Sequence, residues 1–327
     1  MLDLEQLRSG PAEAPTNDAP MLVIVQTRQE IAEGVVRLDL VRPDGGAFPE
    51  WSPGTHISVQ VPNGLQRQYS LCGARGDTST WTIAVQREKH SRGGSAWLCD
   101  HAKSGTQLPI THVRNNFKFE EAPSYIFVAG GVGITPLLSM IEAARGKGAP
   151  WQLLYGGRSR RSMAFLDNLS THQQVDICAE DERGRPDVAG YIGEPRRGTL
   201  IYACGPEGML SALQDATAAW PPGSLRVERF SALEVDRETG AFVVELARSK
   251  KELVVEADRS ILETVRAAGI EADSSCEEGT CGTCETRVLA GVPEHRDAVL
   301  SDADRASNGY MMICVSRCRS DRLVLDL

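Results

Sequence analysis

The sequence contains no apolar run that approaches the roughly 18 residues needed for a membrane-spanning helix. It also has no basic stripe, and its formal net charge is −9 at pH 7. A nucleic-acid-binding protein needs basic side chains that release counterions from phosphates. These absences argue against a membrane partner and against a nucleic-acid partner, and the acidic balance fits a basic protein partner instead.

The first twenty residues lack the basic and apolar regions of a signal peptide, so residues 1–20 are predicted to be a mobile extension. The nine cysteines are an odd number spread over a long chain. Such usage is typical of a reducing compartment rather than of a disulfide framework. The sequence therefore predicts a cytoplasmic protein.

A chain of 327 residues is too long for one ordinary core, and its composition shifts along its length. Residues 21–120 show short β-branched runs broken by Gly and Pro, which predict an antiparallel β-barrel. Residues 121–228 alternate apolar strands with helical stretches, including a helix expected over 162–169, and this predicts an α/β parallel sheet. A charged linker over 229–240 leads to 241–327, where a hairpin, a helix and later strands predict a third, α+β domain.

Four cysteines carry the strongest signal. They are Cys276, Cys281, Cys284 and, further along the chain, Cys314. C-x4-C-x2-C with a distant fourth cysteine is the ligand spacing of a plant-type [2Fe–2S] cluster. Gly279 and Gly282 leave room for the backbone to lie close to the inorganic sulfide.

A four-cysteine zinc site is the alternative for this region. Structural zinc usually takes two C-x2-C pairs, and here only Cys281 and Cys284 form such a pair. A zinc site through these two residues with Cys314 and Cys318 is conceivable. The spacing favours the iron–sulfur cluster, and the role of Cys318 stays open.

Two stretches of the predicted barrel could bind a flavin. The first combines a guanidinium, an aromatic ring and a hydroxyl over Arg67, Gln68, Tyr69 and Ser70. The second is a glycine pair with a neighbouring arginine at a helix start, a suitable anion site, over Arg92, Gly93, Gly94 and Ser95. Taken alone, the first stretch favours an ordinary strand with alternating faces, and the second is also compatible with a flexible turn. Together, on one barrel, they favour a flavin phosphate.

Two further stretches lie where a parallel sheet binds ligands, beyond the carboxyl ends of strands. They are Gly130, Gly131, Val132, Gly133, Ile134 and Thr135, and then Cys204, Gly205 and Pro206. The glycines would let a pyrophosphate approach the backbone at a helix start. The pattern is not G-x-G-x-x-G. Arg158 and its neighbouring arginines could clamp a 2′-phosphate, bind the pyrophosphate or face solvent.

With these motifs and their order, the chain resembles the phthalate dioxygenase reductase family, which includes the reductases of vanillate-type O-demethylases. The resemblance covers nearly everything after residue 20. It implies that Arg67, Tyr69 and Ser70 belong to a flavin signature, that Arg92 to Ser95 bind its phosphate, and that the four cysteines bind the cluster. It also implies a C-terminal ferredoxin domain of β-grasp fold, FMN rather than FAD, NADH, and a monomer.

The resemblance further implies a reductase component that passes electrons from NADH through FMN to the [2Fe–2S] cluster and on, one at a time, to a Rieske non-haem iron oxygenase or O-demethylase. No residue is expected to act as an acid or base. Tyr69, Ser70, Cys204 and Phe230 are expected near the flavin and nicotinamide.

Three other functions are alternatives to the reductase. An oxygenase is unsupported, because no C-x-x-H pair accompanies Cys99 and His101. A passive carrier with a ferredoxin module would contain no flavin. A stand-alone flavin oxidase or diaphorase would turn over without a protein partner.

Overall fold

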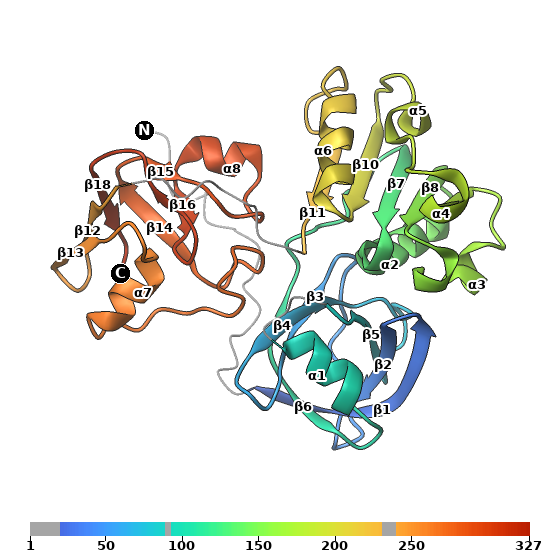
Figure 1. Ribbon diagram of the computed structural model, residues 1–327, viewed down its shortest axis with the longest axis horizontal. Coiled ribbons are helices and arrows are strands. Elements are labelled where there is room, and N and C mark those ends of the chain that lie inside the picture. The colour runs from blue at the N-terminus through green and yellow to red at the C-terminus, as the bar shows by residue number, and fades with distance from the viewer. Residues whose placement is uncertain (1–19, 89–92, 231–239) are drawn as a thin grey trace, which may run out of the picture.

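The computed structural model describes residues 20–88, 93–230 and 240–327, and each of its three main sheets has its own core (Figure 1). The predicted extension, Arg92 and most of the predicted linker lie outside these residues. The predicted fold class, an antiparallel barrel followed by a parallel sheet and an α+β unit, is confirmed.

The first sheet is the barrel, with strand order β4-β3-β6-β1-β2-β5 and antiparallel pairing throughout. Its elements are β1 (Met21–Ala32), β2 (Val35–Val41), β3 (His56–Gln60), β4 (Gln66–Ser70), β5 (Trp81–Gln86), α1 (Gly94–His101) and β6 (Gln107–Arg114). Alternate residues such as Leu38 and Ile57 fill its interior, where Phe48 stacks on Trp81 with ring centroids 4.2 Å apart. The edge strands β4 and β5 contact each other and close the barrel.

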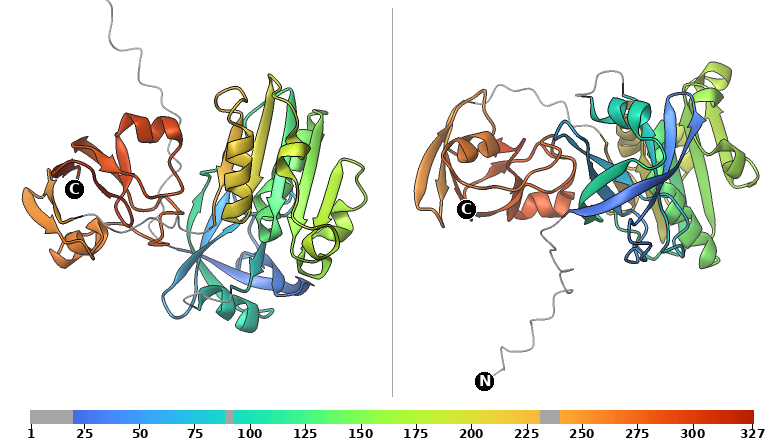
Figure 2. Two further views of the ribbon diagram at one scale, coloured as in Figure 1. Left: turned by 45° about the horizontal axis from the view of Figure 1, so that its top comes forward. Right: turned by 90° about the horizontal axis from the view of Figure 1, so that it is seen from below.

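The second sheet is parallel, with strand order β11-β10-β7-β8-β9. Its elements are β7 (Ser124–Gly130), η1 (Gly131–Gly133), α2 (Ile134–Gly146), β8 (Trp151–Gly157), η2 (Arg160–Ser162), α3 (Leu166–Leu169), β9 (Val175–Ala179), α4 (Glu180–Arg183), α5 (Val188–Ile192), β10 (Thr199–Cys204), α6 (Glu207–Ala216) and β11 (Leu225–Glu228). Helix α2 covers one face, and α5 and α6 cover the other (Figure 2). The central strand β7 is buried on both faces and is therefore almost continuously apolar.

The helix expected over 162–169 is wrong in extent. The structure has the 3-10 turn η2 and the short helix α3 there, and Phe165 lies between them with φ 62°. A non-glycine residue in this left-handed region interrupts a right-handed helix.

The third sheet has the order β13-β12-β18-β14-β16 and is mixed, because β12 and β18 are parallel. Its domain contains β12 (Phe242–Leu246), β13 (Lys251–Val255), α7 (Ile261–Ala267), β14 (Glu285–Ala290), β15 (Pro293–Glu294), α8 (Asp302–Ser307), β16 (Tyr310–Met312), β17 (Arg317–Cys318) and β18 (Arg322–Leu325). The Ser260 hydroxyl accepts the backbone N–H of Glu263 at 3.1 Å, and the Glu263 carboxylate accepts the N–H of Ser260 at 2.8 Å. The N-terminus of α7 is therefore closed by a capping box.

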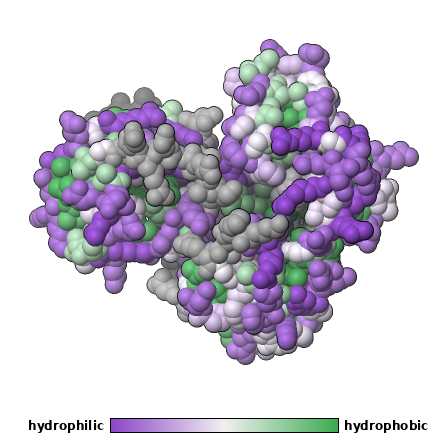
Figure 3. All heavy atoms as spheres, viewed as in Figure 1, coloured by the Kyte–Doolittle hydropathy of each residue, from purple (hydrophilic) through white to green (hydrophobic). Residues whose placement is uncertain are grey.

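The surface in Figure 3 is largely hydrophilic, with hydrophobic atoms in scattered places. Within the described ranges, no helix combines the length and the apolar character that crossing a membrane requires.

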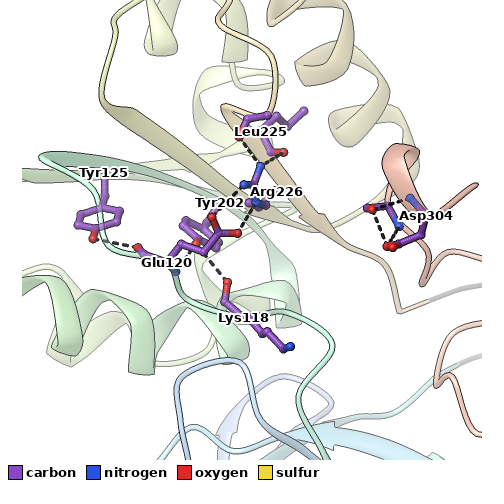
Figure 4. Close-up of polar contacts among 9 residues, drawn as sticks. Lys118, Glu120, Tyr125, Tyr202, Leu225, Arg226 and Asp304 are labelled. Atoms are coloured by element: carbon purple, nitrogen blue, oxygen red, sulfur yellow. Dashed lines mark hydrogen bonds and ion pairs between the residues drawn. The ribbon is translucent and has the colours of Figure 1, made fainter. Parts of the chain in front are cut away.

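A polar network fastens the connector after β6 to the parallel sheet (Figure 4). The Tyr202 hydroxyl donates to the Lys118 carbonyl at 3.1 Å and accepts the Glu120 N–H at 2.8 Å. The Arg226 guanidinium pairs with the Glu120 carboxylate at 2.9 and 3.1 Å, and the Tyr125 hydroxyl donates to the Glu120 carbonyl at 3.1 Å. The network therefore fastens the connector to the strands β7, β10 and β11 of the parallel sheet. Figure 4 also includes Asp304, at the N-terminus of α8.

Candidate functional site

The four predicted cluster cysteines lie together in the third domain, with all four side chains buried. The Cys284 and Cys314 sulfurs are 3.1 Å apart. The backbone N–H groups of Glu278 and Thr280 point at the Cys276 sulfur, at 3.3 and 3.4 Å. Hydrogen bonds from the Cys281 and Cys314 thiols hold the pKa of Cys276 below its usual range. The loop therefore offers converging sulfurs and free amides, which suits a cluster whose sulfurs accept hydrogen bonds.

Glycine is required in this loop for space as well as conformation. Gly279 has φ 69°, and a Cβ there would lie 2.6 Å from Val315 Cγ2 and 3.1 Å from Asp297 Cα. Any other residue would be strained and would collide with a buried neighbour.

Cys318 lies apart from this group. Its thiol donates to the Ser320 carbonyl at 2.6 Å. Among the described residues, no set of three or more His, Cys, Asp or Glu side chains is arranged to hold a single metal ion. The direction of the Cys318 thiol favours Cys314 over Cys318 as the fourth ligand.

The predicted flavin residues meet at one rim of the barrel. The hydroxyl groups of Tyr69 and Ser70 are buried, and neither has a hydrogen-bond partner within the described chain. A Cβ on Gly94 would lie 2.9 Å from Arg67 Cγ, so the arginine stem runs along the start of α1. Gly93, with φ 103°, precedes that helix. The rim thus places unpaired hydroxyl groups and a cation at a helix start, and these residues fit a flavin and its phosphate.

The two glycine-rich stretches of the parallel sheet are packed directly against each other. A Cβ on Gly133 would lie 2.3 Å from the Cys204 carbonyl oxygen, and a Cβ on Gly130 would lie 2.4 Å from Pro206 Cδ. They follow the neighbouring strands β7 and β10. A nucleotide pyrophosphate could reach the backbone here, as the sequence predicts.

The remaining predicted residues differ in their surroundings. Cys204 is fully buried, and burial raises the pKa of its thiol well above the usual range, so it packs as a neutral group. Phe230 is 46% exposed at the end of the described second segment. The Arg158 carbonyl accepts the Asp181 N–H at 3.1 Å, which places this arginine beside the short helix α4 that follows β9.

Glu228 is a residue of this site that the sequence analysis missed. It ends β11 opposite Cys204, and its Oε2 is buried with no hydrogen-bond partner in the described part of the chain. Burial raises the pKa of this carboxyl group to about 8. The only sequence signal was an acidic residue at the end of an apolar strand.

Replacing Glu228 with glutamine is expected to flatten the dependence of stability on pH. The unfolded carboxyl group loses its proton near pH 4.5 and the folded one near pH 8, so the folded state of the parent loses stability as pH rises through this window. Thermal midpoints at pH 5.5 and 8.5 would check this: the drop between the two should be smaller in Glu228→Gln. An equal drop in both proteins would contradict the assignment. Glu207→Gln is the control, because Arg229 holds the pKa of Glu207 low.

The barrel rim also contacts the cysteine loop directly (Figures 1 and 2). Gln68 alternates with Arg67 and Tyr69 along β4 and so lies on the other face of the strand, where its side-chain amide donates to Ser275 Oγ at 2.8 Å. The Asn116 amide donates to the Cys281 carbonyl at 3.0 Å. Ser275 precedes one cluster cysteine, so the candidate flavin and cluster sites are adjacent. Nothing in the sequence singled out Asn116.

Two family models match separate regions of the chain. The family model of the 2Fe-2S iron-sulfur cluster binding domain matches residues 244–319, and that of the oxidoreductase NAD-binding domain matches residues 127–215. The chain is 40% identical to the phthalate 4,5-dioxygenase oxygenase reductase subunit of Pseudomonas putida, over 93% of this chain and 95% of that protein.

Two solved structures extend the likeness to the whole fold. Phthalate dioxygenase reductase, described as a modular structure for electron transfer from pyridine nucleotides to [2Fe-2S], matches with a TM-score of 0.71 at 35% identity, over 96% of this chain and 100% of that one. An intact type IV self-sufficient cytochrome P450 monooxygenase matches with a TM-score of 0.88 at 40% identity. That match covers 98% of this chain and 43% of the monooxygenase.

Proposed function

This chain belongs to the phthalate dioxygenase reductase family, and on that premise we propose that it is the reductase component of a Rieske-type oxygenase or O-demethylase system. It carries electrons from NADH through FMN and a [2Fe–2S] cluster to the terminal oxygenase. The family resemblance and the oxidoreductase function predicted from the motifs are confirmed by the relatives and by the two family models.

One observation carries the proposal. The rim with the unpaired Tyr69 and Ser70 hydroxyl groups contacts the cysteine loop through Gln68 and Ser275, and the barrel strand β5 contacts η1 of the candidate nucleotide site. Electron transfer between three sites requires such adjacency, and a protein with only one or two of these functions would not need it.

When bound, nicotinamide supplies a hydride, flavin accepts two electrons and releases them singly, and the cluster carries one at a time. The residues of this chain bind and position these groups. We assign the flavin to Arg67, Tyr69, Ser70 and the turn over 92–95, the nucleotide to 130–135, 204–206 and Arg158, and the cluster to the four cysteines. Gln68 instead holds the cysteine loop.

The domain boundaries that we propose follow the sheets: 21–120 for FMN, 121–228 for NADH and 241–327 for the cluster, with a linker over 229–240. None of the nine cysteines forms a disulfide, which supports a cytoplasmic location. We propose that the protein is a monomer.

The test is an anaerobic titration with NADH, followed by the visible spectrum and by EPR of frozen samples. Bleaching of the flavin with about one reduced [2Fe–2S] signal per chain is expected. Bleaching of the flavin without the cluster signal would contradict the reductase function and favour a diaphorase. A purified protein that contains no flavin would favour the passive carrier.

The electron acceptor has a second candidate. Since a P450 monooxygenase matches 98% of this chain, a haem monooxygenase could take the place of the Rieske oxygenase. Stopped-flow mixing of the NADH-reduced protein with a Rieske oxygenase, and separately with a haem monooxygenase, would distinguish the two acceptors. The acceptor is the one whose rising concentration brings the rate of re-oxidation to a plateau.

NADH is expected to be preferred over NADPH. Arg160 is paired with Glu182 at 3.0 Å, and the short helix α4 places three acidic residues beside it, so a 2′-phosphate would meet negative charge. The kcat/KM for NADH should exceed that for NADPH by at least about tenfold, which corresponds to about 1.4 kcal/mol. Steady-state reduction of ferricyanide with each nucleotide measures this ratio, and equal use of NADPH would contradict it.

A further inference from the structure

His56, the first residue of β3, has an unusual environment for a histidine. Its side chain is buried at 5% exposure, and neither ring nitrogen has a hydrogen-bond partner within the described residues. A buried imidazole with both nitrogens unpaired is costly. Partners that the polypeptide does not provide would remove this cost.

The neighbours of His56 across the sheet indicate which face it occupies. It pairs with Ser70 on β4 and with Arg114 on β6. Residues directly opposite in a sheet point to the same face, so His56 shares a face with Ser70, whereas Ile57 points into the barrel core. The Ser70 hydroxyl is also buried and unpaired. Two adjacent unsatisfied groups on one face indicate one common ligand.

The same face meets the cysteine loop of the third domain. Gln68, two residues before Ser70 on the same face, donates to Ser275, the residue before the first cluster cysteine. His56 therefore lies on the face of the sheet that meets the cysteine loop. Burial, with Arg114 adding to it, lowers the pKa of His56 to about 4, so near pH 7 the ring is neutral and has one donor and one acceptor nitrogen.

We propose that His56 is a further flavin-binding residue, which hydrogen-bonds the flavin ring and fixes it on the side that faces the cysteine loop. This inference rests on the proposed function. Because Ser70 is its direct cross-strand partner, the flavin explains both unsatisfied groups, whereas a hydrogen bond to the cluster sulfur would explain only His56.

Substitution by phenylalanine and by glutamine tests this role. His56→Phe keeps a flat ring of similar size but removes both nitrogens, and His56→Gln keeps a donor and an acceptor. The loss of one buried hydrogen bond should weaken FMN binding about tenfold in His56→Phe. His56→Gln should restore most of it. The Kd is measured from the fluorescence of FMN released when the purified holoprotein is diluted.

His112→Phe is the matched control. His112 lies on the neighbouring strand β6 opposite Ser58, on the same face as His56, but its ring is already hydrogen-bonded to Thr111 at 3.1 Å. FMN affinity should stay at the parent value in this variant. The cluster EPR signal per chain shows that each variant is folded, and the midpoint potential of the cluster is recorded alongside.

The outcomes are distinct. FMN affinity at the parent value in His56→Phe would overturn the proposal, as would a shift of the cluster potential alone, which would assign His56 to the cluster. Should His56→Phe not fold, ¹⁵N NMR of the parent histidine rings with and without FMN replaces it: an unchanged His56 signal overturns the assignment. A parent protein that contains no FMN would contradict the proposed function itself.

Discussion

Cys314→Ser is expected to abolish the [2Fe–2S] cluster and, with it, electron delivery to the oxygenase. Cys314 is buried with its sulfur 3.1 Å from that of Cys284, so the loss of its thiolate leaves the cluster with three ligands. Electron transfer to the oxygenase should fall by more than about 100-fold, since even outer-shell changes cost about 10- to 100-fold in metal sites. Reduction of ferricyanide by NADH, which needs only the flavin, should continue at close to the parent rate. Iron content, EPR and the two assays together measure the effect.

Cys318→Ser is the matched control for this prediction. Its thiol is directed at the Ser320 carbonyl, away from the other sulfurs, so one cluster per chain should remain. A variant at Cys318 that loses the cluster while Cys314→Ser keeps it would show that the ligand assignment is wrong. Zinc in the purified parent protein would favour the alternative of a four-cysteine zinc site.

Gly133→Ala is expected to disable the nicotinamide site. The added Cβ would lie 2.3 Å from the Cys204 carbonyl oxygen and 2.9 Å from the Gly205 nitrogen, and these backbone atoms can move only if the two loops separate. Overpacking of this kind costs about 1–3 kcal/mol of folding free energy. A displacement of about 1 Å at a reacting site can cost about 100-fold in rate, so kcat/KM for flavin reduction by NADH should fall by about that factor. Stopped-flow bleaching of the flavin measures it.

Gly146→Ala provides the comparison. Gly146 ends the same helix that follows Gly133, and a Cβ there meets nothing within 4 Å. The substitution should leave flavin reduction unchanged and should raise stability slightly, because alanine favours a helix by up to about 1 kcal/mol. If Gly133→Ala behaved in the same way, the close approach of the two loops would not be needed for NADH binding.

Much of the architecture was predictable because it depends on local patterns. Short strands broken by turn residues in 21–120 predicted the barrel, and strands alternating with helices in 121–228 predicted the parallel sheet. Both patterns are local, because the spacing of apolar residues in a strand or helix reflects which of its faces is buried. The helix over 162–169 was wrong because Phe165 adopts a left-handed conformation that periodicity does not report.

The sequence by itself determined the chemical inventory of this protein. Three cluster cysteines lie within nine residues, so their spacing alone indicates a cluster, and the flavin and nucleotide motifs become informative through their order along one chain. Only the tertiary structure decided how these sites meet. Gln68 and Ser275 are 207 residues apart, and His56 and Glu228 are ordinary strand residues until folding buries them beside a neighbouring strand. Contacts between domains depend on the packing of whole surfaces, which no local period encodes.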